Sequence, residues 1–405
     1  MRSSKPVVVI ILLLLAFAGV SEAFVQAVSP QEKQQRPRRA TGNENQTPAA
    51  KDSTNSGAED VDEGDVVRVE TQLVSVPAVI TNSAGRPLTG LRPENFLLFE
   101  DGQQQSIANF GTTEAPFEIA LLLDTSGSTR ADVSLIREAA NSFINSLRLG
   151  DRVAIIAFKA EGRGSDQVAK VDVLSELTSD RKSLQGSIEA LGSASGTPFY
   201  DSLNRIVTEI FREPAREEVR GRRAVVALTD GVDSASDTDF GAARAKLIRS
   251  GIACYFIQVN TEDFVEDRLL KDCQDDGRLT LSAKQLQRYR SIFVPRAKSE
   301  DFTNFCQMGS FERMQISRDL YNLARREMND LAKASGGRNF VAATLGDARS
   351  AFSQVATEIG TQYSLGYYPT NKTRDGKFRS IRVEVRGLPE KPQVRAREGY
   401  YAPKS

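Results

Sequence analysis

The pattern of hydrophobic and polar positions divides the chain into a central region and two flanks. In the central region, unbroken apolar runs alternate with stretches whose apolar residues recur every three to four positions. An unbroken run is typical of a strand buried on both faces of a parallel sheet, and the longer period is typical of an amphipathic helix. Runs of the first kind lie at 119–123, 153–158, 224–228 and 252–259. This alternation predicts an α/β fold with a doubly wound, mostly parallel sheet.

The predicted α/β domain extends over residues 114–361. The segment 171–177 is predicted to be an edge strand. Near the end of the domain, the alternation of helices and strands is predicted to continue with a helix over 317–335. Between them, the stretch 260–315 is polar and poorly periodic, so we interpret it as a surface insertion.

Both flanks show the two-residue alternation of half-buried strands. They comprise residues 66–113 and 362–405, and Asp101-Gly102 in the first flank is a strong hairpin-turn signal. Each flank is too small to hold a core alone. Because the ends of a domain often lie near each other, the two flanks are predicted to form one small β-sandwich-like module. Two independent flaps on the α/β domain are the alternative.

The N-terminal residues have the composition of an export signal. Residues 1–23 combine Arg2 and Lys5 with a short apolar run and small residues at a cleavage point, which predicts a signal peptide. Residues 24–65 contain few apolar side chains and are predicted to be a disordered linker. We therefore expect an exported protein, in the periplasm, at the cell surface or secreted, with no membrane insertion after cleavage. An uncleaved N-terminal anchor is the alternative.

Composition excludes several function classes. The chain has 53 Lys and Arg against 53 Asp and Glu, so it lacks the basic surplus of a nucleic-acid-binding protein. It has no histidine, which excludes histidine-based catalysis and histidine-ligated metals. Of its three cysteines, Cys254 lies in an apolar run and is expected to be a buried free thiol. Cys273 and Cys306 lie in the insertion, and we predict a disulfide bond between them.

Oxygen-bearing side chains follow the predicted strands. Asp124, Ser126 and Ser128 come directly after the first apolar run, Thr197 lies in a break before a helix, and Asp230 ends another run. Open α/β sheets bind ligands at this edge, and hard oxygen atoms suit Mg²⁺. The alternative is that Asp124 and its neighbours only cap a helix.

The ordered set of motifs resembles the von Willebrand factor A domain family, with its metal-ion-dependent adhesion site. The family's Asp-x-Ser-x-Ser motif matches residues 124–128, its threonine matches Thr197 in GTPFYDSL, and its last aspartate matches Asp230 in VVALTDG. The flanking sequences, among them RPLTGLRPENFLLFEDG and YSLGYYPTN, resemble an exported bacterial subfamily of such proteins. The resemblance covers about 66–403 and departs from the family pattern at 260–315.

The resemblance implies a divalent cation, Mg²⁺ or another such as Mn²⁺. The hydroxyls of Ser126 and Ser128, and sometimes that of Thr197, would hold it directly, while Asp124 and Asp230 would act mostly through bound waters. An open coordination position would accept an Asp or Glu carboxylate from a protein partner. Two further carboxylates near these motifs, Asp201 and Asp233, are expected to be turn or helix caps, and Asp201 could also orient Thr197.

The expected function is therefore that of an exported, adhesion-type binding protein and not of an enzyme. Phosphotransferases built on an aspartate carry a second acidic residue where Ser126 stands here, and the chain has no histidine to hold phosphate. A structural envelope scaffold with a non-functional metal site is the alternative.

Overall fold

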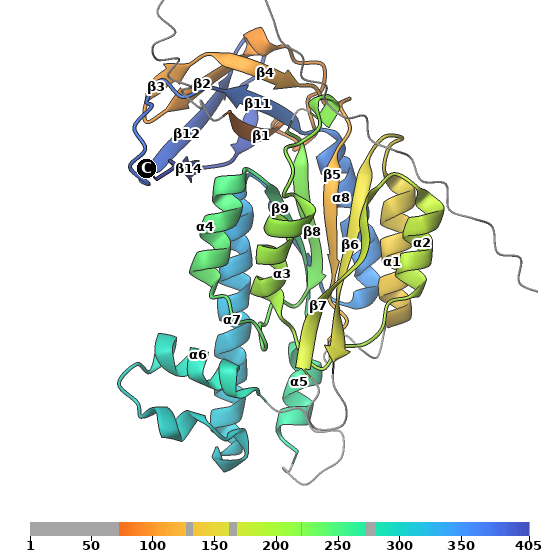
Figure 1. Cartoon of the computed structure of the whole chain (residues 1–405), viewed down its shortest axis with the longest axis vertical. Helices are drawn as coiled ribbons and strands as arrows, with labels where there is room; N and C mark the ends of the chain where they lie inside the picture. Colours follow the sequence, from red (N-terminus) through yellow and green to blue (C-terminus); the bar gives the residue numbers. More distant parts are fainter. Residues whose placement is uncertain (1–72, 127–132, 162–167, 220, 272–280, 405) are drawn as a thin grey trace, which may run out of the picture. The chain divides into compact units, whose positions relative to one another are not determined.

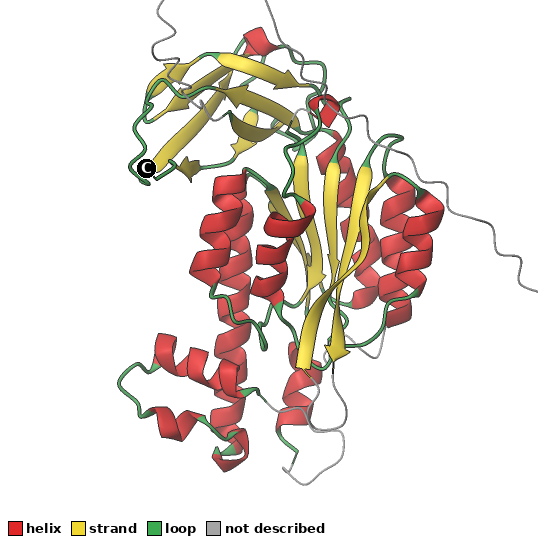
Figure 2. Ribbon diagram, viewed as in Figure 1, coloured by secondary structure: helices red, strands yellow, loops and turns green. Residues whose placement is uncertain are grey.

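The computed structural model describes residues 73–126, 133–161, 168–219, 221–271 and 281–404. Within these residues the strands form one six-stranded and two four-stranded sheets. Helices flank the six-stranded sheet of the central region, as Figures 1 and 2 show. The predicted signal peptide and linker, 1–23 and 24–65, lie outside the described residues.

The central sheet consists of β5 Glu118–Leu123, β6 Arg152–Glu161, β7 Val168–Thr178, β8 Arg223–Thr229, β9 Ala253–Val259 and β10 Arg338–Ala342. Its strand order is β10-β9-β8-β5-β6-β7. All neighbours are parallel except β7, which pairs antiparallel with β6 at the edge. Every residue of β5 and β9 is buried, as expected for inner strands covered on both faces. The doubly wound sheet and the edge strand at 171–177 are confirmed.

Helices cover both faces of this sheet (Figure 1). One face carries α1 Val133–Ser146, α2 Arg181–Glu189 and α8 Ala348–Gly360, and the other carries α3 Phe199–Arg205, α4 Phe240–Ser250 and α7 Ser310–Ser335. Alternate residues of β5 point to opposite faces: Leu121 packs in the first layer and Leu122 in the second. The carboxyl ends of β5 and β8 therefore meet at one edge, between two packed layers.

The two four-stranded sheets have the orders β13-β1-β11-β4 and β14-β12-β2-β3. Their strands are β1 Val74–Thr81, β2 Phe96–Glu100, β3 Gln103–Gln105, β4 Ile107–Gly111, β11 Tyr363–Tyr367, β12 Phe378–Val385, β13 Gln393–Ala396 and β14 Gly399–Tyr401. Each sheet takes strands from both flanks, and residues of both sheets share one hydrophobic cluster. The predicted β-sandwich-like module is confirmed. In the hairpin formed by β2 and β3, the turn consists of Asp101 and Gly102, whose φ angles are 46° and 85°.

The guanidinium of Arg397 joins the module to the α/β domain. It is buried and donates to the backbone carbonyls of Ser75 in β1, at 2.9 Å, and of Ile248 in α4. Nearby, the Gln362 amide donates to the Tyr255 hydroxyl at 2.9 Å. A buried cation with several carbonyl acceptors fixes both elements, because separating them would leave these groups unpaired.

The stretch 260–315, which we interpreted as a polar and poorly periodic surface insertion, contains regular helices where the structure describes it. It contains α5 Glu262–Leu269 and α6 Ala283–Phe293, and α7 begins at Ser310 instead of at 317. Apolar side chains of these helices form a cluster of their own, which includes Val265, Leu286 and Leu320. The polar residues lie on the outer sides of short amphipathic helices, which is why the stretch lacks an obvious period.

Cys306 takes part in a disulfide bond, and Cys254 is free and buried. The free thiol at Cys254 is therefore confirmed. The predicted partner of Cys306, Cys273, lies outside the described residues, so the pairing stays a prediction. Within the part of the chain that the structure describes, no helix is both long and apolar enough to cross a membrane.

Candidate functional site

Asp124 follows β5 directly, at the edge where β8 also ends. Its N–H donates to the carbonyl of Leu228 at 3.0 Å, which continues the pairing of the two strands. Its carboxylate is fully buried: one oxygen accepts the N–H of Ser126 at 2.9 Å, and the other accepts the hydroxyl of Thr229 at 2.6 Å. Asp124 is therefore buried, held by Ser126 after β5 and by Thr229 at the end of β8.

Asp230 directly follows β8 and accepts hydrogen bonds from hydroxyl groups elsewhere in the chain. One carboxylate oxygen accepts the N–H of Val232 at 3.0 Å. The other lies 2.8 Å from the hydroxyl of Thr261 and 3.4 Å from that of Tyr321 on α7. The two hydroxyls lie 2.7 Å apart. Sequence reasoning did not identify Thr261 and Tyr321, because a lone hydroxyl in a non-periodic stretch carries no signal.

Thr197 comes from the loop that leads into α3. Its N–H donates to the hydroxyl of Ser234 at 2.8 Å, and its carbonyl accepts the N–H of Ser234 at 3.0 Å. The loop after β8 thus fixes the backbone of Thr197 from both sides. Thr197 lines the same cavity as Asp230.

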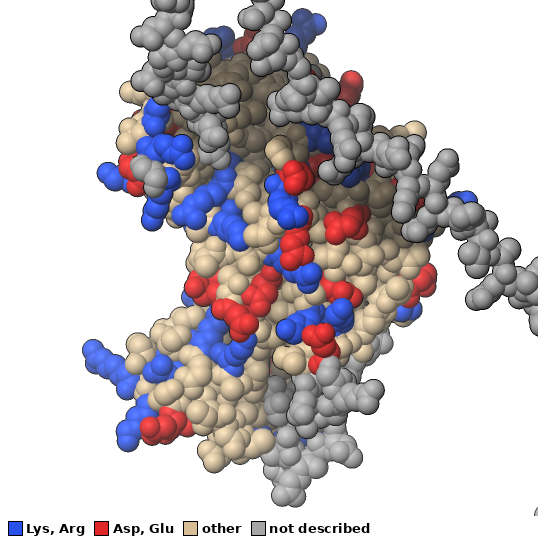
Figure 3. All heavy atoms as spheres, viewed as in Figure 1, with Lys and Arg blue, Asp and Glu red and all other residues tan. Residues whose placement is uncertain are grey.

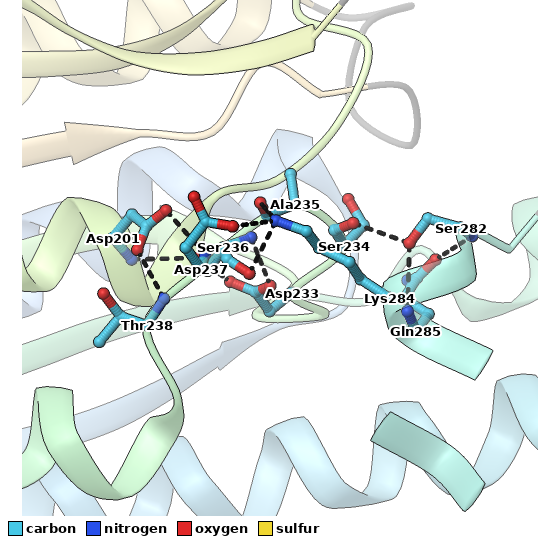
Figure 4. Close-up of polar contacts among 10 residues, drawn as sticks. All are labelled: Asp201, Asp233, Ser234, Ala235, Ser236, Asp237, Thr238, Ser282, Lys284 and Gln285. Carbon is cyan, nitrogen blue, oxygen red and sulfur yellow. Dashed lines mark hydrogen bonds and ion pairs between the residues drawn. The ribbon is translucent and has the colours of Figure 1, made fainter. Parts of the chain in front are cut away.

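The loop over 233–238 is itself held by Asp201 and by the start of α6 (Figure 4). The Asp201 carboxylate accepts the N–H groups of Asp237 and Thr238 at 3.0 and 2.9 Å. Lys284 donates to the Ala235 carbonyl at 2.8 Å and to the Asp237 carboxylate at 2.5 Å. Asp201 therefore does not cap a helix of its own, as the sequence suggested, but holds the backbone of the loop after β8. It orients this loop, while Ser234 orients Thr197.

Two buried carboxylates dominate the electrostatics of the edge. Burial, and secondly the negative charge of Asp230, raises the pKa of Asp124 to about 7, although hydrogen bonds from Ser126 and Thr229 oppose the shift. Placing a positive charge beside these two groups would stabilise their ionised forms.

Three of the predicted ligands share one cavity. Ser126, Thr197 and Asp230 line a space of about 110 Å³, while Asp124 lies buried behind them. Ser128 lies outside the described residues. No cluster of three or more His, Cys, Asp or Glu residues that could hold a metal occurs within the described ranges, so a cation here would depend on hydroxyl oxygens. Two carboxylates with neutral hydroxyls are an all-oxygen donor set, which fits Mg²⁺ or Mn²⁺.

Parts of this chain are similar to known proteins. The von Willebrand factor type A domain family matches residues 118–286. No curated protein matches the chain. Among solved structures, proximal thread matrix protein 1 from the mussel byssus is 14% identical with a TM-score of 0.40, and the match covers 64% of this chain.

Two other solved structures are similar over different lengths. A von Willebrand factor type A protein from Catenulispora acidiphila is 11% identical over 83% of this chain and 75% of its own, with a TM-score of 0.39. The type V pili tip protein Mfa5 from Porphyromonas gingivalis is 17% identical over 40% of this chain and 26% of its own, with a TM-score of 0.24. The chain spans 50% of the length of the mussel protein. The family match and the six-stranded sheet with helices on both faces identify residues 118–286 as a von Willebrand factor type A domain.

Proposed function

We propose that the protein is an exported binding protein that uses a divalent cation to bind a carboxylate of a protein partner. The observation that carries the proposal is the cavity lined jointly by Ser126, Thr197 and Asp230, from three separate loops at one sheet edge. Von Willebrand factor type A domains often mediate protein–protein interactions, which supports a binding role.

The residues present suit Mg²⁺, or Mn²⁺ in its place. In this proposal the hydroxyls of Ser126, Ser128 and Thr197 hold the ion, and Asp124 and Asp230 bind it through water. Burial, and secondly the negative charge of Asp230, raises the pKa of Asp124, and a cation bound nearby would stabilise the ionised forms of both groups. Because neutral hydroxyls leave most of its charge uncompensated, the bound ion would supply an electrostatic attraction for an acidic side chain.

The proposal also covers the kind of partner and the export of the protein. Basic and acidic side chains are mixed on the face drawn in Figure 3, which favours a protein partner over nucleic acid. Export rests on the composition of residues 1–23. A mature protein whose mass lacks these residues would support it.

A scaffold without a bound ion is the second candidate function. The observation in its favour is that Asp230 accepts hydrogen bonds from Val232 and Thr261 of the chain itself. In that case the carboxylate would need no cation to be satisfied.

Cation-dependent capture separates the two functions. The purified protein is immobilised and exposed to envelope extract with Mg²⁺ or with EDTA, beside Ser126→Ala and the control Ser183→Ala. Ser183 is exposed on α2, away from the site. We expect a partner that EDTA and Ser126→Ala both release and that Ser183→Ala retains. If neither EDTA nor Ser126→Ala changes the amount of partner captured, the result would favour the scaffold.

A further inference from the structure

β10 is the last strand of the central sheet, and its outer edge is open. The strand pairs with β9, and no strand of the described residues lies on its other side. The carbonyl of Ala342 accepts the N–H of Asn260, which directly follows β9, at 3.1 Å. Because the N–H and C=O groups of successive residues point to opposite edges of a strand, those of Asn339 and Val341 are directed away from β9. These groups can pair with a further strand.

This edge lacks the protection that the opposite edge of the same sheet has. There, β7 exposes the charged side chains of Lys170 and Glu176, and charges of this kind discourage the addition of a strand. β10 carries its one charge on its first residue, Arg338. Val341, an apolar and β-branched residue, is 74% exposed. An uncharged edge with an exposed valine favours pairing with another chain.

A cleft adjoins β10 on one face of the strand. It encloses about 660 Å³ and lies between β10, α8 and the β1–β13 pair of the module. Ser353, Thr357 and Gln393 line it with exposed side chains, so the cleft is open to solvent. Phe340 also lines it, whereas Val341, the next residue, points to the opposite face of the sheet. A strand added along this edge would therefore direct every second side chain towards the cleft.

The charges of the cleft favour an acidic side chain. Arg338 and Arg395 flank Glu358: Arg395 forms an ion pair with its carboxylate, and the Arg338 guanidinium lies 3.7 Å from the same carboxylate. Two cations against one anion line the cleft, which leaves one positive charge over. The guanidinium of Arg338 is more than half exposed and lies over the Phe340 ring, 4.8 Å from its centre. It is thus both held in place and accessible to a carboxylate.

We infer that β10 is a docking edge for an extended segment of a protein partner, which joins the central sheet as a further strand. Main-chain hydrogen bonds to Asn339 and Val341 supply the affinity, and alternate side chains of the segment supply the specificity. The side chain that faces the cleft is acidic and meets Arg338. The side chains on the other face are apolar and pack against Val341. None of the candidate metal ligands lines this cleft, so the docking requires no cation.

Two pentapeptides test the inference on the whole protein. One is acetyl-Thr-Val-Glu-Val-Thr-amide, and the other has lysine in place of the glutamate. Binding is followed by peptide-observed NMR in Mg²⁺ and in EDTA. Hydrogen exchange of the N–H groups of Asn339 and Val341 is measured with and without the glutamate peptide, and sedimentation gives the oligomeric state.

Two variants probe the edge and the charge separately. Val341→Pro removes one outward N–H and no hydrogen bond to β9, because proline is tolerated where an edge strand's N–H faces solvent. Its matched control is Val341→Thr, which keeps the N–H and a branched side chain. Arg338→Gln removes the surplus charge. Its control, Lys182→Gln, removes an exposed cation on α2, which packs beside β7.

We expect the wild type to bind the glutamate peptide equally well in Mg²⁺ and in EDTA, and the bound peptide to slow exchange at Asn339 and Val341. Val341→Pro should weaken binding by roughly tenfold, because a main-chain hydrogen bond is lost. Val341→Thr and Lys182→Gln should bind nearly as tightly as the wild type. Arg338→Gln should lose the preference for the glutamate peptide over the lysine peptide.

Three results would overturn the inference. The first is a wild type that binds neither peptide, and the second is a folded Val341→Pro protein that binds as tightly as Val341→Thr. The third is a wild-type dimer that Val341→Pro dissociates, because a second copy of the chain would then occupy the edge. If Val341→Pro does not fold, the exchange rates of the wild type and the peptide preference of Arg338→Gln decide. None of these results bears on the Mg²⁺ response, so the proposed function is tested independently.

Discussion

At the scale of single residues, the site consists of groups whose positions are set by partners on other loops. Asp124 is held by Thr229, and Asp230 by Thr261. The sequence was enough to select Asp124, Thr197 and Asp230 as candidates for one edge of the sheet. Each of them follows a strand or a break that the hydrophobic pattern reveals. Their hydroxyl partners could not be predicted, since a hydroxyl far away in the sequence gives no sign of which carboxylate it will meet. The complete burial of Asp124 was equally invisible.

Cys254 provides a prediction at this scale. Burial raises the pKa of its thiol to about 12. At pH 8 the reactive thiolate is therefore on the order of 10⁻⁴ of the population, and the sulfur is also sterically shielded. We expect no reaction of Cys254 with Ellman's reagent in the native protein. Reaction should occur after unfolding in denaturant.

The same titration tests the disulfide. Without reductant, the unfolded protein should react with one equivalent of Ellman's reagent, at Cys254 alone, because Cys306 is disulfide-bonded. After reduction, the unfolded protein should react with three equivalents of the reagent, one for each cysteine in the chain. Three reactive thiols in the unreduced, unfolded protein would refute the bond between Cys273 and Cys306. Rapid native reaction would contradict the burial of Cys254.

At the scale of elements, the insertion is the part of the fold that pattern reading described least well. Its helices are short, so Val265 and Leu269 supply only one turn of apolar spacing before α5 ends. Such a run is too brief to distinguish from chance in a polar stretch. The strands of the central sheet were predictable for the opposite reason. Burial on both faces makes each of them a continuous apolar run.

Lys284 connects this insertion to the site, which gives a prediction at the scale of elements. Its ammonium binds the Ala235 and Ser236 carbonyls and the Asp237 carboxylate, and the same loop carries Ser234, which holds Thr197. We expect Lys284→Ala to speed hydrogen exchange over 234–238 and to weaken Mg²⁺ binding. Because Lys284 is exposed, the cost in global stability should stay within about 1 kcal/mol.

Lys298→Ala is the matched control for Lys284, since it removes an exposed lysine of the same insertion. It should change neither hydrogen exchange over 234–238 nor Mg²⁺ affinity. If Lys284→Ala behaves like this control in both measurements, α6 does not support the loop.

At the scale of the whole molecule, the β module makes the two flanks depend on each other. β1 pairs with β11 and β13, and β2 pairs with β12. Ending the chain after Thr361 removes β11, β12 and β13 together. We therefore expect residues 74–111 to lose their protection from hydrogen exchange in the truncated protein, while the central sheet keeps its own. Retained protection over 74–111 would show that the first flank is stable alone.

This shared module could be anticipated from the sequence because neither flank has enough apolar residues to enclose a core. The sequence did not show how the module meets the α/β domain. The contact depends on Arg397, a buried arginine in a basic and otherwise exposed-looking tail, whose acceptors are backbone carbonyls. Backbone acceptors leave no trace in the sequence.

The measurement that tests the account most directly is the melting temperature with and without millimolar Mg²⁺ or Mn²⁺, for the wild type, Thr197→Ala and Ser183→Ala. Thr197→Ala should fold, because the hydrogen bonds to Ser234 use backbone groups of Thr197. A cation that binds the folded state stabilises it by mass action, by about 2.7 kcal/mol at a hundredfold excess over Kd. We predict a rise of a few degrees in the wild type and in Ser183→Ala, and none in Thr197→Ala. A wild-type melting temperature that neither ion changes would contradict the proposed metal site.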